Sequence, residues 1–444
     1  EDGTEHTFTL QSGVKFHDGT DFSAEAVVFN LDRMVSPDSK SRLAGPRLTG
    51  FYESSEAVDA TTVKIVFSQP NGAFLTDLSQ NFMTMLSPAA VEKFSAEEIG
   101  RNPVGTGPFT FVEWVENSHI KMVRNEEYNW ASPMFGRQGT AYLDSITFRI
   151  IPEDGARMAA LESGELNYVD IVPTIDFTRI EEDSNYTTYS VPQPGVPYAY
   201  MLNTKRAPTD DLAVRQAINY AVDKEQVIDT LYQGLYTPAY GPLSPASFAY
   251  NPAVETMYPF DPEQAKQVLE EAGWVEGSDG IREKDGTPLE IEHYVFTDTK
   301  VAEVMQAQLE EVGIRSNVTL LEVGAVNEAA TQGEASNLAP LPYRDADPAV
   351  LCVVLCIKNE GKGFAWTFHK NDELDSEIEM GQSTTDPAER EQHYGRAQIL
   401  AMEEALLIPV YNNNGLTAST AEVKGVTFDE KGVDPWVFNI WIEQ

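Results

Sequence analysis

One segment limits the fold more than any other, because it reads as strand, helix and strand joined by short connections. Glu290–Phe296 predicts the first strand. The apolar positions Val301–Val312 predict a helix that ends at Gly313, and Ile314–Leu321 predicts the second strand. A unit of this size links parallel strands by a right-handed crossover. The sequence therefore predicts an α/β fold in which helices pack on mixed, partly parallel sheets.

Size and charge narrow the function. The chain has 444 residues, enough for two or three domains. It carries 31 Lys and Arg against 70 Asp and Glu, a formal net charge of −39. Such a charge repels phosphate backbones, so nucleic acid is excluded as a partner. The acidic residues are spread along the chain, which predicts a solvated surface and a monomer, with attraction of a cationic ligand as the alternative. No apolar run approaches the roughly 18 residues of a membrane-spanning helix.

The first residues bear on location. The chain begins at Glu1, with no initiator Met, no basic stretch and no apolar stretch. We expect a signal peptide to have been removed, or the chain to be a fragment, and a periplasmic or other extracytoplasmic location.

Motifs for catalysis are missing. The sequence holds no GxSxG, HExxH or GxxxxGK[ST] pattern, and its six histidines show no metal-ligand spacing. We therefore expect neither an enzyme nor a cofactor. Cys352 and Cys356 fit no redox or zinc motif. Their spacing favours buried apolar side chains, with a local disulfide as the alternative in an oxidising compartment.

Five ordered motifs carry a resemblance to a known family: Thr7–Thr20, Asn102–Phe109, Leu202–Lys205 followed by Val214–Asp223, Asp347-Pro348, and Ile408–Tyr411. Together they resemble the extracytoplasmic solute-binding proteins of peptide/nickel-type ABC importers. Members usually carry roughly 50 more residues before the first motif, so we expect a chain shortened at this end.

The resemblance implies a two-lobed fold like that of periplasmic binding proteins, with a hinge cleft that closes on the ligand. It places an extra subdomain at residues 1–145, the first main lobe at 146–245 and 418–444, and the second lobe at 246–417. It also implies capture of a small solute, a peptide by preference, and delivery to the transmembrane permease subunits of an ABC importer.

The ligand-anchoring position departs from the peptide-binding pattern. Those members have an Asp four residues before the Pro that is Pro348 here, where this chain has Arg344 and then Asp345. Either Asp345 substitutes through a shift of one residue, or the ligand presents an anion to Arg344, whose planar guanidinium suits a carboxylate. The third alternative is that Arg344 points away from the ligand and pairs with a nearby acidic residue.

The resemblance supplies further candidates. Dipeptide binders have an Arg near Phe296 and a Trp near Val323, and neither is found here, which argues against a dipeptide. The remaining expected ligand-binding residues are Asn203, Thr204, Tyr240, Tyr343, Tyr411 and Asn413. The alternatives to a peptide are a small anionic or amino-acid-derived compound, an oligosaccharide and a nickel chelate. A ligand-sensing receptor module is the alternative of another class.

Overall fold

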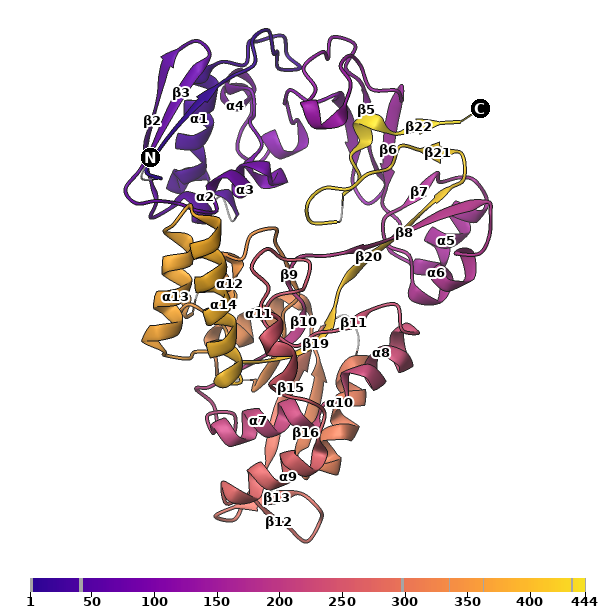
Figure 1. The fold of residues 1–444 in the computed structure, drawn as a ribbon. Coiled ribbons are helices and arrows are strands. Elements are labelled where there is room, and N and C mark those ends of the chain that lie inside the picture. Colours follow the sequence, from indigo (N-terminus) through magenta and orange to yellow (C-terminus); the bar gives the residue numbers. More distant parts are fainter. Residues whose placement is uncertain are drawn as a thin grey trace.

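The computed structural model describes residues 3–39, 43–296, 299–334, 336–361, 363–432 and 434–443. Figure 1 shows two bodies joined by long strands, with a third, N-terminal group of elements resting on the helices of the lower body. We call these the first lobe, the second lobe and the N-terminal subdomain.

The N-terminal subdomain is a three-stranded antiparallel sheet covered by helices. The sheet order is β1-β3-β2, and β3 alternates between buried and half-buried residues, as a strand with one covered face should. Ser23 caps α1 by accepting a hydrogen bond from the backbone N–H of Ala26. The elements are β1 (Glu5–Thr9), α1 (Ala24–Val35), α2 (Ala44–Leu48), β2 (Tyr52–Asp59), β3 (Thr62–Phe67), α3 (Phe74–Ser79) and α4 (Pro88–Lys93).

The first lobe contains two small sheets. The antiparallel sheet β4-β5-β6 packs with the end of the chain through the buried Phe438. In the sheet β7-β20-β8, Leu416 and Ala418 pack against α5 and α6. The elements are β4 (Phe109–Val115), β5 (His119–Arg124), β6 (Ser145–Arg149), α5 (Asp154–Glu162), β7 (Tyr168–Val169), α6 (Thr174–Ile180), β8 (Tyr186–Pro192), β20 (Asn414–Thr420), β21 (Val423–Lys424) and β22 (Trp441–Ile442).

The second lobe is built on a six-stranded mixed sheet of order β11-β19-β10-β17-β15-β16. The predicted strand–helix–strand unit is confirmed, since β15 and β16 pair in parallel and α10 connects them. The strands are β10 (Tyr198–Leu202), β11 (Thr237–Pro238), β15 (Glu290–Val295), β16 (Arg315–Leu320), β17 (Leu338–Pro340) and β19 (Leu407–Asn412). The helices are α7 (Leu212–Ala221), α8 (Lys224–Tyr232), α9 (Pro262–Glu271), α10 (Lys300–Glu311), α11 (Val323–Gln332), α12 (Val350–Leu355), α13 (Asp372–Gln382) and α14 (Pro387–Glu403).

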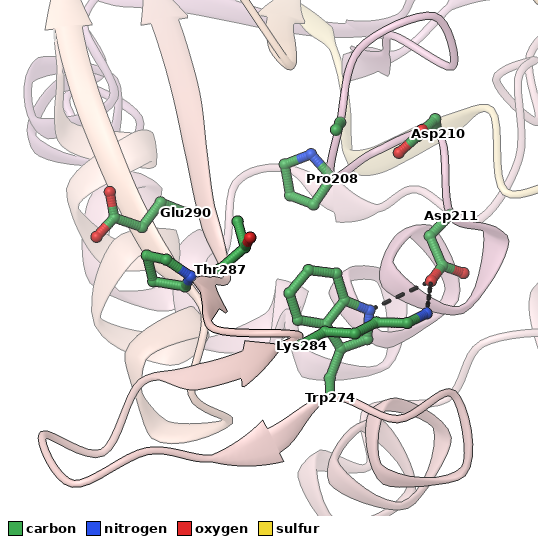
Figure 2. A pocket seen from close by; sticks show the side chains of 9 residues that line it. Pro208, Asp210, Asp211, Trp274, Lys284, Thr287 and Glu290 are labelled. Carbon is green, nitrogen blue, oxygen red and sulfur yellow. Dashed lines mark hydrogen bonds and ion pairs between the residues drawn. The ribbon is translucent and has the colours of Figure 1, made fainter.

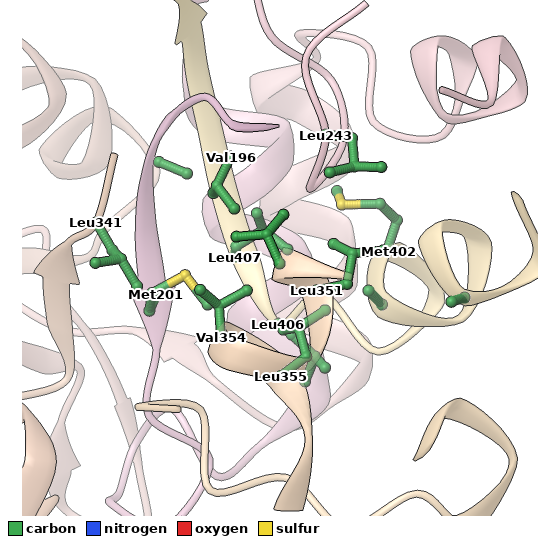
Figure 3. Packing of buried hydrophobic residues seen from close by; sticks show 14 of the residues in the cluster. Val196, Met201, Leu243, Leu341, Leu351, Val354, Leu355, Met402, Leu406 and Leu407 are labelled. Carbon is green, nitrogen blue, oxygen red and sulfur yellow. The ribbon is translucent and has the colours of Figure 1, made fainter. Parts of the chain in front are cut away.

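Two apolar clusters stabilise this lobe. Figure 3 shows one of them, where Met201 and Leu407 from the sheet meet Leu351 and Leu355 of α12. Full burial of each such side chain contributes about 1.5–3 kcal/mol. Cys352 and Cys356 lie in this cluster, and they form a disulfide. The predicted burial is confirmed, and the bonded alternative is the one that the structure contains.

Sheet membership differs from the expected boundaries. β10, α7 and α8 fall within 146–245, which we assigned to the first main lobe, yet β10 is an inner strand of the second lobe's sheet. The expected subdomain 1–145 is also divided, because β4 and β5 pack with the C-terminal segment rather than with β1–β3. The sequence could not predict these boundaries, since both depend on contacts between distant segments.

Candidate functional site

The chain passes between the two lobes at two neighbouring places. One passage runs from β8 through β9 (Gly195–Val196) to β10, and the other runs from β19 through Asn413 to β20. The backbone N–H of Gln193 donates to the carbonyl oxygen of Asn413 over 3.0 Å. These two segments form the connection about which the lobes can rotate.

Arg344 lies at this connection. It belongs to β18 (Tyr343–Arg344), which pairs antiparallel with β9 so that Arg344 faces Gly195. At Gly195, φ is +102°, and a Cβ there would lie 2.3 Å from the carbonyl oxygen of Tyr343. Only glycine allows the two backbones to approach so closely. Of the predicted residues, Tyr343, Arg344, Asp345 and Asn413 are therefore brought to the passage between the lobes.

The side chain of Arg344 is exposed, and it takes part in none of the ion pairs found within the described residues. Its charge acts on groups across the connection. The pKa of Tyr236 is raised to about 12 by burial and by the neighbouring Tyr232, and Arg344 opposes this rise. Burial and Asp429 raise the pKa of Asp434 in the first lobe, and Arg344 again opposes the rise. Arg344 thus presents an available cation near both lobes.

Asp345 is in the opposite situation. It is 4% exposed, and the backbone N–H of Asp347 donates to its Oδ1 at 3.0 Å. Its Oδ2 accepts a hydrogen bond from the guanidinium of Arg47, which comes from α2 in the N-terminal subdomain. Arg47 also pairs with the buried Asp77 of α3 at 3.0 Å. Both oxygens of Asp345 already have partners.

A second buried ion pair lies next to the first. Arg390 of α14 donates to Asp347 at 2.7 Å, and both side chains are under a tenth exposed. Asp347 and Asp345 both act on Asp77. Burial raises the pKa of Asp77 to about 7, Arg47 opposes the rise, and the two neighbouring carboxylates add to it.

Tyr411 is part of a stack of tyrosines. Its ring lies between those of Tyr198 and Tyr236, with centroids 4.7 and 5.1 Å away and nearly parallel planes. The hydroxyl of Tyr232 donates to that of Tyr411 at 3.2 Å. Tyr411 is 6% exposed, so most of its surface contacts protein.

Two predicted residues form hydrogen bonds inside the second lobe. The amide of Asn203 donates to the carbonyl oxygens of Gly333 and Ser336, at 3.0 Å each. The hydroxyl of Thr204 donates to the carbonyl oxygen of Thr367 at 2.9 Å. Both side chains fix the loop after β10 to the segments beside it.

The last three predicted residues lie elsewhere in the second lobe. Phe296 and Val323 follow β15 and β16, at the edge where those parallel strands end. Phe296 packs against the apolar cluster of Figure 3, while Val323 is 49% exposed. Tyr240 is half-buried, and the ammonium of Lys224 lies over its ring, 4.8 Å from the centroid.

Sequence reasoning missed Arg47, Asp77, Tyr198 and Tyr236. Arg47 lies 298 positions from Asp345 and in a short helix without a periodic pattern, so no local signal pointed to it. Tyr198 had a weak signal, since it is aromatic and begins β10 at one of the passages between the lobes. Tyr236 precedes β11, which pairs with β19, and that pairing between distant segments gave no local signal.

A surface pocket of about 390 Å³ in the second lobe lies apart from these residues. Figure 2 shows the side chains that line it. The indole N–H of Trp274 and the ammonium of Lys284 both bind Asp211, at 3.2 and 3.3 Å. None of the predicted site residues lines it. Asp211, Trp274 and Lys284 therefore pair with one another, and they join the start of α7 to the hairpin of β13 (Arg282–Lys284) and β14 (Thr287–Pro288).

The described residues contain no group of three or more His, Cys, Asp or Glu side chains placed to hold a metal ion. Within the same ranges, every helix is too short or too polar to span a bilayer.

Comparison with known proteins gives consistent results. Residues 1–338 match the family model described as bacterial extracellular solute-binding proteins, family 5 Middle. The glutathione-binding protein GsiB of Salmonella typhi is 31% identical over 434 residues, which cover 96% of this chain and 81% of GsiB.

Solved structures agree. NikA from Brucella suis, in complex with Fe(III)-EDTA, is 27% identical with a TM-score of 0.86, and the match covers 100% of this chain and 89% of NikA. The periplasmic binding protein DppA from Helicobacter pylori, in complex with the peptide STSA, is 25% identical with a TM-score of 0.83, over 100% of this chain and 87% of DppA. The expected two-lobed α/β fold is thereby confirmed.

Proposed function

This chain belongs to the bacterial extracellular solute-binding proteins of family 5. We propose that its ligand is a peptide-like solute that lies between the lobes and whose carboxylate binds the guanidinium of Arg344. The chain is the ligand-binding component of an ABC importer and not an enzyme, as the sequence led us to expect. A small solute and the permease are its partners.

The state of Arg344 carries the proposal. It is an exposed guanidinium with no ion-pair partner among the described residues, on a chain of net charge −39. An arginine on so acidic a protein would ordinarily find a carboxylate, and many of the others here do. A planar fork with free donors matches a ligand carboxylate, and the tyrosines beside it offer apolar surface.

The relatives narrow the class of ligand. GsiB is named for glutathione, and DppA was solved with a tetrapeptide; both ligands combine carboxylates with peptide groups. The same observation favours a second candidate, a metal enclosed in a polycarboxylate chelator, since NikA was solved with Fe(III)-EDTA. Such a ligand brings its own metal-binding groups and leaves only carboxylates for the protein to recognise.

We further propose that the mature protein acts as a monomer outside the cytoplasm after removal of a signal peptide. The relatives are periplasmic binding proteins, and the strong negative charge opposes self-association.

A ligand screen tests the proposal. Thermal unfolding is followed with glutathione, trialanine, Ni(II)-EDTA and an oligosaccharide, for the native protein and for Arg344→Gln. A ligand present at about 100 times its Kd raises the free energy of unfolding by about 2.7 kcal/mol. We expect the peptide-like ligands to bind the native protein and Arg344→Gln to raise their Kd by about 10-fold or more.

The control replaces an arginine of similar exposure that has surface partners, Arg179→Gln. It should leave the Kd unchanged. A response to the oligosaccharide alone, or equal peptide affinity in native and Arg344→Gln proteins, would contradict the proposal.

A further inference from the structure

The neighbouring residues Arg344 and Asp345 differ in exposure and in ion pairing. Arg344 is exposed and without an ion-pair partner, whereas Asp345 is 4% exposed and bonded to Arg47. Within the described part of the second lobe, Arg390 is the one guanidinium paired with either of the buried carboxylates Asp345 and Asp347. The guanidinium that pairs with Asp345 belongs to Arg47 of the N-terminal subdomain.

Arg47 is held in this position from several sides. It pairs with Asp77 at 3.0 Å, and its guanidinium lies 5.7 Å from the centroid of the Phe82 ring. Its subdomain is fixed to α13 nearby, where the backbone N–H of Gly72 donates to the carbonyl oxygen of Gln382 at 2.8 Å. Figure 1 shows α2 and α3 resting on the ends of α13 and α14.

The approach at Gly72 leaves no room for a side chain. A Cβ there would lie 2.2 Å from the carbonyl oxygen of Thr384. Arg47 is thus part of a docked and close-packed contact rather than a mobile surface arginine.

The charges show what Arg47 prevents. Among the described residues of this cluster, the guanidiniums of Arg47 and Arg390 pair with three buried carboxyl groups, those of Asp77, Asp345 and Asp347. Without Arg47, Asp345 would lose its ion-pair partner, and Arg390 would be the guanidinium left to the cluster. A cluster so short of positive charge, next to the residue that we expect to bind the ligand, would attract a ligand ammonium group.

We propose that Arg47 is a specificity-determining residue, which occupies Asp345 from the N-terminal subdomain so that the cleft selects its ligand by a carboxylate at Arg344 and not by an ammonium group at Asp345. This inference rests on the proposed function. Arg47 touches no ligand in this account, and it acts through Asp345.

Matched ligand derivatives test it. Calorimetry compares trialanine and glutathione with their N-acetyl forms, which lack the ammonium, and with their C-terminal amides, which lack that carboxylate. For the native protein we expect N-acetylation to change the Kd by less than about threefold and amidation to raise it by about 10-fold or more.

Arg47→Gln should create a preference for ligands with a free amino group. It should bind the free-amino form more tightly than the N-acetyl form by about 10-fold, because Asp345 becomes available. Arg47→Lys, which keeps the charge, should behave like the native protein. Asp345→Asn added to Arg47→Gln should abolish the new preference. The matched control is Arg101→Gln, an exposed arginine paired with Glu116 near the same subdomain.

The ratio of the Kd values for the free-amino and N-acetyl ligands does not depend on a general loss of protein stability. It therefore distinguishes a role of Arg47 in ligand specificity from a role in stability alone. If Arg47→Gln does not fold, the native protein still decides: a 10-fold loss on N-acetylation overturns the inference. A folded Arg47→Gln with the native ratio also overturns it. If no peptide-like solute binds the native protein, the proposed function itself fails, which is a distinct result.

Discussion

Gln193 and Asn413 are joined by a backbone hydrogen bond of 3.0 Å, although 220 positions separate them in the chain. Each lies in one of the two passages between the sheets of the lobes. The bond keeps those passages side by side at the point where the ligand-binding candidates meet. Changes at this connection should therefore affect both stability and binding.

The first prediction concerns Gly195. Gly195→Ala should lower the free energy of unfolding by about 1–3 kcal/mol, because φ is +102° and the new Cβ would press on the carbonyl oxygen of Tyr343. Urea unfolding measures the loss. Gly286→Ala is the control, since φ there is also positive at +76° but nothing lies within 4 Å. Equal losses in both variants would show that the close approach to β18 has no cost of its own.

The second prediction concerns pH. Burial raises the pKa of Asp77 from 3.8 to about 7, so the folded state holds this proton more tightly than the unfolded chain. The contribution of this proton to the free energy of unfolding is complete below pH 3.8, the pKa in the unfolded chain, and it is lost as the pH rises through the folded pKa of about 7. Asp77→Asn should therefore become more stable, relative to the native protein, as the pH rises through this window. Urea unfolding at several pH values checks it, and a difference that stays constant with pH would refute the assignment.

The third prediction concerns the tyrosine stack. Tyr411→Phe removes the acceptor at 3.2 Å from the hydroxyl of Tyr232 and should cost about 0.5–1.5 kcal/mol. Tyr411→Ala also removes the ring between Tyr198 and Tyr236 and should cost about 3–5 kcal/mol. Chemical denaturation of both variants measures the costs. A similar small loss for both would mean that the stack contributes little to stability.

The fourth prediction concerns the disulfide. Cys352 and Cys356 are 3% and 1% exposed, inside the apolar cluster of the second lobe. A thiol reductant should therefore leave the bond intact in the native protein and cleave it readily once urea unfolds the lobe. Titration of free thiols follows the reaction. Rapid reduction without denaturant would show that this part of the lobe opens easily.

Local patterns predicted the elements well. The strand–helix–strand unit from Glu290 to Leu321 was found because its periodicity and its glycine stop lie within one short stretch. Asp261 and Asp386 carry a local signal of the same kind, since each Asp caps its helix and is followed by Pro.

Contacts between distant segments decided the rest. The motif around Pro348 singled out Arg344 and Asp345 but left their roles open, because the choice depended on a guanidinium 298 positions away. The assignment of β10 to the second lobe had the same origin, as its partners β17 and β19 lie far along the chain. The ligand contacts of all the predicted residues, Arg344 and Asp345 included, stay predictions.

The two passages between the lobes also determine which movements the molecule allows. The two passages are hydrogen-bonded to each other at Gln193 and Asn413, which holds them side by side. We therefore expect the lobes to move mainly by rotation about a line through these two residues. On that expectation, a ligand between the lobes is approached along a single arc, and the lobes meet in the same register each time they close.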